Sequence, residues 1–208
     1  GILGKDELCC GDSVRRLGNE YVFDGLAKAN VSMFAEKGVK KVITQCPHCY
    51  NTLKNDYRQY GAELEVIHHT ELIDSLLKEG RLRLSPDDSL GRVVFHDSCY
   101  LGRYNDIYTA PRRAVAAATG EAPVEMERHH ADAFCCGAGG GRMWLEESIG
   151  ERINLQRVEE ALAAGPQTIC LSCPYCMTMF EDGLKDKGAA EKVQVLDVAE
   201  IVARAIKP

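Results

Sequence analysis

Nine of the ten cysteines in this 208-residue chain follow a spacing pattern that occurs twice. Between the vicinal pair and the Cys-Pro-x-Cys pair of each copy lie 35 residues in the first copy and 36 in the second. Thiolates gathered four or five to a site suit iron-sulfur clusters or zinc better than structural disulfides. The pattern therefore predicts a metal-binding protein. The nine residues are Cys9, Cys10, Cys46 and Cys49 in the first copy, and Cys99, Cys135, Cys136, Cys173 and Cys176 in the second.

A disulfide framework is the competing interpretation. Ten cysteines in 208 residues is a lower density than in small secreted scaffolds, and a chain of this length can build a core without cross-links. The chain opens without a signal-peptide pattern and has no apolar stretch near the roughly 18 to 20 residues that span a bilayer. We therefore expect metal ligation in a reducing environment, on the cytoplasmic side of the membrane.

Charge and ligand spacing argue against nucleic acid as a partner. The formal net charge is -6, and the Lys and Arg residues are scattered rather than massed on one stretch. The partners of each Cys-x-x-Cys pair lie tens of residues away and next to each other, which is not the spacing of a zinc finger.

The repeat extends beyond the cysteines and predicts the fold. Residues 38–50 resemble residues 165–177, and residues 66–73 resemble residues 195–202. Short apolar strands alternate with amphipathic helices, which indicates an α/β architecture with mostly parallel sheets. Strands are expected at 39–44, 64–67, 91–96, 124–126, 167–171 and 193–196, and helices at 50–60, 72–78, 110–118, 177–186 and 198–206, with another from about Met143.

We expect two small pseudo-symmetric lobes, with residues 1–88 forming the first repeat and residues 89–208 the second. The first repeat opens at a counterpart of the strand before the second vicinal pair, so its front part of about 35 residues is expected to be missing. That part would hold the counterpart of Cys99. The N-terminal lobe is then truncated and its site one ligand short, in a piece of a larger chain or complex. The alternative is that this repeat never had a fifth cysteine.

Local structure around the cysteines favours an anionic cofactor. Cys46 and Cys173 each follow a strand and open a helix with proline at its first position, so their thiolates meet the positive end of the helix dipole. The glycine run at residues 137–141 lets the backbone approach a bulky group closely. Neither glycine motif of nucleotide-binding sites is present.

The cysteine spacing resembles that of the cysteine-rich CCG domain, which occurs in heterodisulfide reductases and in the iron-sulfur subunits of glycolate, lactate and glycerol-3-phosphate oxidising complexes. The resemblance covers essentially the whole chain. It implies a noncubane 4Fe-4S cluster in a complete domain, held here by Cys99, Cys135, Cys136, Cys173 and Cys176. Cys9, Cys10, Cys46 and Cys49 match in the first copy, whose site is left open between a cluster, zinc and no metal.

Longer stretches, such as residues 96–103 and 135–144, resemble the large membrane-anchored iron-sulfur reductases that connect electron-transfer flavoprotein to menaquinone. This resemblance implies a flavoprotein donor, a membrane or quinone-reducing partner, and membrane association through parts outside this chain. Cys170 is additional to the family pattern and lies in an apolar strand, where we expect a small buried hydrophobe. His48 and His96 lie beside the cysteines and are candidates for hydrogen bonds to cluster sulfur.

Three functions remain open from the sequence. The first is an electron-transfer module that relays single electrons from a flavoprotein towards a quinone. The second is a heterodisulfide or disulfide reductase that acts at the cluster, and the third is a zinc-bound structural module. Electron transfer is favoured, because no acid-base pair or substrate-binding motif stands out beside the cysteines. The sequence identifies no catalytic residue.

Overall fold

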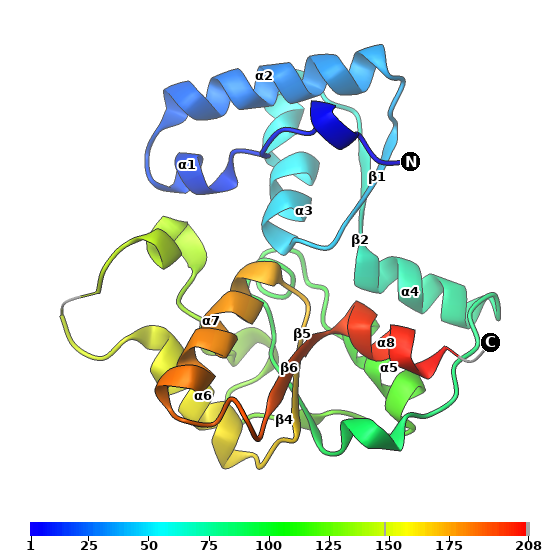
Figure 1. Ribbon diagram of the computed structural model, residues 1–208. Coiled ribbons are helices and arrows are strands. Elements are labelled where there is room, and N and C mark those ends of the chain that lie inside the picture. Colours follow the sequence, from blue (N-terminus) through cyan, green and yellow to red (C-terminus); the bar gives the residue numbers. More distant parts are fainter. Residues whose placement is uncertain (148, 207–208) are drawn as a thin grey trace.

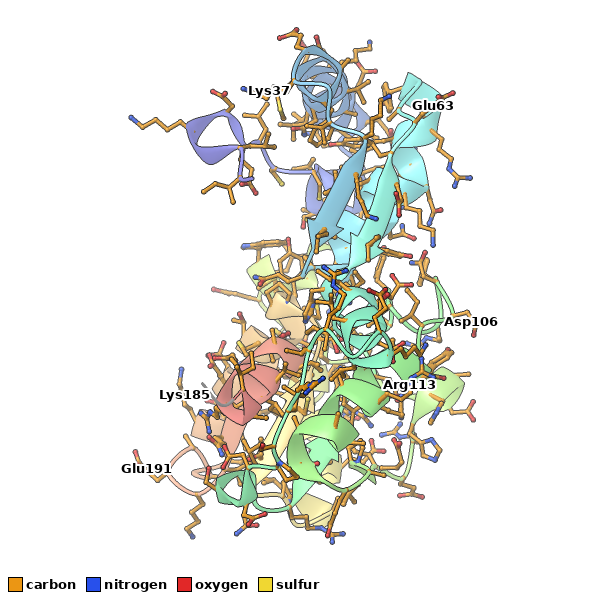
Figure 2. All side chains as sticks on the ribbon, turned by 90° about the vertical axis from the view of Figure 1, so that its right-hand side faces the viewer. Lys37, Glu63, Asp106, Arg113, Lys185 and Glu191 are labelled. Atoms are coloured by element: carbon orange, nitrogen blue, oxygen red, sulfur yellow. The ribbon has the colours of Figure 1, made fainter. Side chains whose placement is uncertain are left out.

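Two parallel sheets organise the chain, whose computed structural model describes residues 1–147 and 149–206. Figure 1 shows the resulting two lobes, with residues 1–68 of the first repeat above the second repeat and residues 69–88 packed beside it. Seen from the side, Lys37 and Glu63 lie at the far end of the first lobe, and Lys185 and Glu191 lie in the second (Figure 2). The expected α/β class with parallel sheets is confirmed.

The first lobe has a two-stranded sheet of β1 (Lys41–Thr44) and β2 (Glu65–His68), paired in parallel. Its core packs Phe23, Ala27 and Phe34 against Tyr50 and Tyr57. The helices of this repeat are α1 (Asp12–Arg16), α2 (Glu20–Glu36), α3 (Pro47–Lys54) and α4 (His69–Lys78), with short 3-10 helices at Gly4–Asp6 and Asp56–Tyr60.

The second lobe has a four-stranded parallel sheet in the order β4-β3-β5-β6. Its strands are β3 (Val93–Phe95), β4 (Val124–Glu125), β5 (Thr168–Leu171) and β6 (Gln194–Asp197). Its helices are α5 (Thr109–Thr119), α6 (Ile153–Ala163), α7 (Pro174–Asp186) and α8 (Val198–Ala205), with 3-10 helices at Asp88–Leu90, His130–Asp132 and Gly139–Trp144.

Strand β5 is buried on both faces, as expected for a parallel strand covered by helices on each side. Side chains alternate along it: Ile169 and Leu171 join the core on the α6 and α7 side, and Cys170 joins the core on the α5 and α8 side. Cys170 is fully buried, and burial raises the pKa of its thiol. The expectation that Cys170 is a core residue is confirmed.

The two repeats share the order strand, helix, strand, helix. In both, a glutamate three residues into the last helix accepts a hydrogen bond from the N-cap amide, at 3.1 Å for Glu71 and 2.8 Å for Glu200. Strand β5 pairs with β3 on one side and β6 on the other, whereas β1 pairs with β2 alone among the residues described. Helix α4 reaches across and packs against α5 and α8, where Ile73 and Leu77 contact the core of the second lobe.

Three sequence-based expectations need correction, and one helix was missed. The helices expected at 50–60, 72–78 and 177–186 each begin three residues earlier, at Pro47, His69 and Pro174, and the first is divided at Asn55 into α3 and a 3-10 helix. Among the residues described, no α-helix begins at Met143: this residue lies in the 3-10 helix Gly139–Trp144, where Gly140 and Gly141 adopt positive φ, and α6 begins only at Ile153. No strand includes residues 1–4. The long helix α2 was not anticipated.

Candidate metal centre

The first vicinal pair, Cys9-Cys10, is held by buried polar side chains from α2 and from the 3-10 helix Asp56–Tyr60. Asn30 donates to the carbonyl oxygen of Cys9 at 3.0 Å, and the hydroxyl of Tyr57 donates to that of Cys10 at 3.0 Å. Asn30 also donates to the Tyr57 hydroxyl at 2.9 Å. Gly11 turns the chain with a φ of 83°, and a Cβ there would lie 2.8 Å from the ring of Phe23.

The first Cys-Pro-x-Cys pair meets this loop at the start of α3. Cys46 is the N-cap of α3, and the Cys49 thiol donates to Cys10 with the two Sγ atoms 3.3 Å apart. The side chains of Cys49 and then Cys9 lower the pKa of Cys10 to about 4, which outweighs the effect of burial. The structure therefore brings the four cysteines of the first copy together.

The second copy repeats this geometry. The amide of Gly137 donates to Sγ of Cys135 at 3.3 Å, as that of Gly11 does to Cys9 at 3.4 Å. The pKa of Cys135 is lowered to about 2, first by the side chain of Cys136 and then by that of Cys99. All five cysteines of the second copy converge at the carboxyl edge of the sheet, and Cys136, Cys173 and Cys176 are buried there.

The loop that carries Cys99 is fixed by an ion-pair network. Arg112 donates to both carboxylate oxygens of Asp97, at 2.8 and 2.7 Å, and to both of Glu125, at 2.7 and 2.8 Å. Asp97 also accepts from the amide of His130 at 2.7 Å. Burial raises the pKa of Asp97, but the hydrogen bonds and positive charge of Arg112 outweigh this effect, so the pKa is lowered. The carboxylate of Asp97 near Cys99 is therefore paired with a guanidinium.

The two sites adjoin at the boundary between the lobes. Helices α3 and α7 begin facing each other there (Figure 1), which places Cys46 beside Cys173. The side chain of Cys173 is the largest cause that lowers the pKa of Cys46 to about 2, ahead of Cys49. The thiols that affect one another's pKa form one series through both copies: Cys9, Cys10, Cys49, Cys46, Cys173, Cys176, Cys136, Cys135 and Cys99.

Aromatic side chains fill the space beside this line of thiols. The ring of His48 lies 4.3 Å from that of Tyr100 and 4.7 Å from that of Tyr175, measured between centroids. His48 Nδ1 is 2.8 Å from a carboxylate oxygen of Asp12, and both side chains are buried. His48 and Tyr175 hold the same position in their Cys-Pro-x-Cys motifs, so their contact reflects the repeat. Asp12 was missed by sequence reasoning, since it lies two residues after a vicinal pair without a motif of its own.

His96 adjoins the second site and is held by a residue that the sequence analysis missed. One ring nitrogen of His96 and the Sγ atoms of Cys136 and Cys176 lie within 4.8 Å of one another. Nε of the fully buried Arg157 donates to His96 Nδ1 at 3.2 Å. Burial, and then the charge of Arg157, lower the pKa of His96 to about 3, so the ring is neutral. Arg157 lies on the buried face of α6 with Asn154, Val158 and Ala161. Its helical spacing from these residues was the sequence signal that could have predicted its burial.

The other histidines lie elsewhere. His68 is buried against the carbonyl of Gln45, and burial lowers its pKa to about 3. His69 joins the lobes through Asp197 at 2.8 Å. His129 and His130 gather with Glu125 at the edge of the second lobe, but Arg112 occupies both oxygens of that carboxylate.

The donor set suits an iron-sulfur cluster. Nine thiols and one histidine nitrogen converge, and thiolate sulfur is the ordinary ligand of such clusters.

In the part of the chain that the structure describes, no helix has the length and apolarity needed to cross a membrane.

The sequence matches the cysteine-rich CCG domain over residues 2–54 and 93–181. It is 50% identical over 206 residues to the "Probable iron-sulfur-binding oxidoreductase FadF" of Bacillus subtilis, covering 99% of this chain and 29% of the relative. It is 46% identical over 215 residues to the "EtfAB:quinone oxidoreductase" of Syntrophomonas wolfei, covering 100% of this chain and 30% of the relative.

It is also 35% identical over 212 residues to one component of the dihydromethanophenazine:CoB--CoM heterodisulfide reductase of Methanosarcina acetivorans, covering 99% of this chain and 51% of the relative. The chain thus spans about a third to a half of the length of these relatives. The family expected from the cysteine spacing is confirmed: the chain belongs to the CCG family of cysteine-rich domains.

Proposed function

We propose that this chain is an iron-sulfur electron-transfer module of a larger oxidoreductase. The proximity of Cys46 and Cys173 carries the proposal, because it makes the two thiol sites neighbours. A bound cluster supplies reversible one-electron chemistry. The protein holds the two sites next to each other, so electrons need only a short path between them.

The second site is proposed to hold a 4Fe-4S cluster of the noncubane kind through Cys99, Cys135, Cys136, Cys173 and Cys176. Burial of three of these five thiols keeps water from the cluster. The start of α7 directs backbone N–H groups and its positive dipole end at Cys173, which favours the reduced, more negative state.

The first site is proposed as a second metal centre, with Cys9, Cys10, Cys46 and Cys49 as its thiol ligands. Its more exposed position makes it the side on which electrons enter or leave, since Cys9 is exposed and none of its other three cysteines is fully buried. The division into repeats at residues 1–88 and 89–208 belongs to this proposal, supported by the shared order of elements.

The partners belong to the proposal as well. The name of the Syntrophomonas relative supports a flavoprotein donor and a quinone as acceptor. Association with a membrane is proposed to occur through a partner or through other parts of a longer chain, in line with the relative from Chromohalobacter named "Probable membrane-anchored ferredoxin".

Metal analysis of protein purified without oxygen tests the proposal. We expect about four iron and four acid-labile sulfide per occupied cluster site, with an electron paramagnetic resonance (EPR) signal that changes with redox state. Zinc without sulfide would overturn the proposal and make the chain a structural module.

A disulfide reductase is the second candidate, favoured by the name of the Methanosarcina relative and by the exposure of Cys9. Reduced, metal-loaded protein would then cleave a small disulfide without any partner. Reduction that proceeds only with a flavoprotein donor would leave electron transfer as the function.

A further inference from the structure

His96 and Arg157 form a buried pair directly beside the second thiol site. His96 follows β3 and is 1% exposed, and Arg157 comes from α6 and is 0% exposed. His96 Nε2 is buried and has no hydrogen-bond partner among the residues described. A ring nitrogen of His96 lies within 4.8 Å of the Sγ atoms of Cys136 and Cys176.

The hydrogen bond from Arg157 determines which nitrogen of His96 carries the proton. A guanidinium can only donate, so Nδ1 must accept the bond from Arg157 Nε at 3.2 Å. The single proton of the neutral ring then resides on Nε2. That N–H is the group left without a partner, and one of the two ring nitrogens lies within 4.8 Å of the Sγ atoms of Cys136 and Cys176.

The same bond argues against His96 as an iron ligand. A metal on Nε2 would require the proton of the neutral ring at Nδ1, where it would face the N–H of Arg157. Two donors would then point at each other, which costs free energy because both side chains are buried.

Arg157 is itself fixed from the side away from His96. Its terminal nitrogen Nη1 donates to the carbonyl oxygen of Arg128 at 3.0 Å and lies 2.9 Å from a carboxylate oxygen of Glu160. Glu160 also pairs with Arg128 at 2.8 Å. The charge of Arg157 is thus balanced, and its Nε is held in place against the ring.

We propose that Arg157 is a positioning residue that fixes His96 as an Nε2–H donor to sulfur at the second site. This inference rests on the proposed function, because the acceptor is sulfur of a metal-bound site. A hydrogen bond to cluster sulfur stabilises the reduced state, so the pair raises the reduction potential of the second site.

The test uses His96→Asn, Arg157→Lys and the control Arg128→Gln. Asparagine can still accept from Arg157 but has no donor at the position of Nε2. Lysine keeps the positive charge without the N–H that faces Nδ1. Arg128→Gln removes the positive charge that pairs with Glu160. It keeps the backbone carbonyl that accepts from Arg157, so the hydrogen bond from Arg157 to His96 should remain. Potentials are measured by EPR-monitored titration, and the histidine tautomer by ¹⁵N NMR on metal-free protein.

We expect full iron and sulfide in all three variants, a lower potential in His96→Asn and Arg157→Lys, and the wild-type potential in Arg128→Gln. Wild-type His96 should be the Nε2–H tautomer, with only weak nitrogen coupling in pulsed EPR. Strong coupling from bound nitrogen, an Nδ1–H tautomer, or an unchanged potential in His96→Asn would overturn this inference and leave the proposed function standing. Wild-type protein without iron and sulfide would instead overturn the proposed function. The tautomer measurement decides the question even where Arg157→Lys does not fold.

Discussion

Position, rather than residue type, distinguishes the proposed ligand cysteines from Cys170. Cys135 and Cys173 lie among other thiols, whereas Cys170 points into the core against α5 and α8. Cys135→Ser and Cys173→Ser should each remove the iron of the second site, about four atoms per chain, because a hydroxyl is a poor substitute for a thiolate. Iron and sulfide analysis of the purified variants measures this loss.

Cys170→Ala is the matched control for these two variants. It should keep the metal of the wild-type protein and cost about 1 kcal/mol of stability, since a small buried group is removed. Loss of iron in Cys170→Ala, or full iron in Cys135→Ser, would contradict the ligand assignment.

Tyr57 illustrates how a single hydroxyl organises the first site. Tyr57→Phe leaves the carbonyl of Cys10 without its donor and removes one acceptor of Asn30, both in buried surroundings. We expect the free energy of unfolding to fall by about 1 to 3 kcal/mol. Urea denaturation measures this change, with Tyr60→Phe in the same 3-10 helix as the control. An equal loss in both variants would show that the hydroxyl of Tyr57 has no special role.

At the scale of elements, the sequence predicts regular strands and their helices well where each segment carries its own signal. Thr168–Leu171 is apolar and short, and Cys173-Pro174 marks the start of the next helix, so both were anticipated. The start of α6 was not, because Gly140 and Gly141 adopt positive φ and the turn approaches Leu17 of the other lobe at Gly141, a long-range contact that no local pattern reveals. The Arg157–His96 pair depends on two elements 61 residues apart, and no local pattern reveals such a contact.

Helix α4 is attached to the second lobe by an ion pair. Arg113 of α5 donates to both carboxylate oxygens of Asp74, at 2.6 and 2.5 Å. These bonds, followed by the bond from Lys78, lower the pKa of Asp74. Because the folded pKa lies below the unfolded value of about 3.9, the ionised form stabilises the fold above that value, and this stability is lost as pH falls through the folded pKa.

Arg113→Gln should therefore reduce stability by about 1 kcal/mol at pH 7, a modest value because half of the Arg113 side chain is exposed. The difference from the wild-type protein should shrink towards pH 3, where Asp74 is losing its charge. Denaturant titrations at both pH values measure it, and Lys78→Gln, which removes the more exposed partner, should have a smaller effect. A difference that is the same at both pH values would rule out the ion pair as its cause.

For the whole molecule, the location of the thiols predicts that metal bound at the proposed sites would join the lobes. Protein contacts across the boundary include polar ones, such as Ser13 with Tyr175 at 3.2 Å and Asn105 with Asn51 at 3.2 Å. Cys46 and Cys173 lie at the same boundary, so metal bound to both sites restrains the two lobes together. Each lobe also has an apolar core of its own.

Removal of metal with a chelator under reducing conditions should therefore loosen the boundary before it unfolds either lobe. Backbone amides at residues 9–16, 46–49 and 173–176 should exchange about tenfold faster or more, which corresponds to about 1.4 kcal/mol of local stability. Amides of β3 and β5 should keep their protection, because both strands lie in the core of the second lobe. Hydrogen exchange followed by mass spectrometry compares the two forms. An equal rise at β3 and β5 would show that metal supports the fold as a whole, and no change at residues 46–49 would show that metal does not hold the boundary.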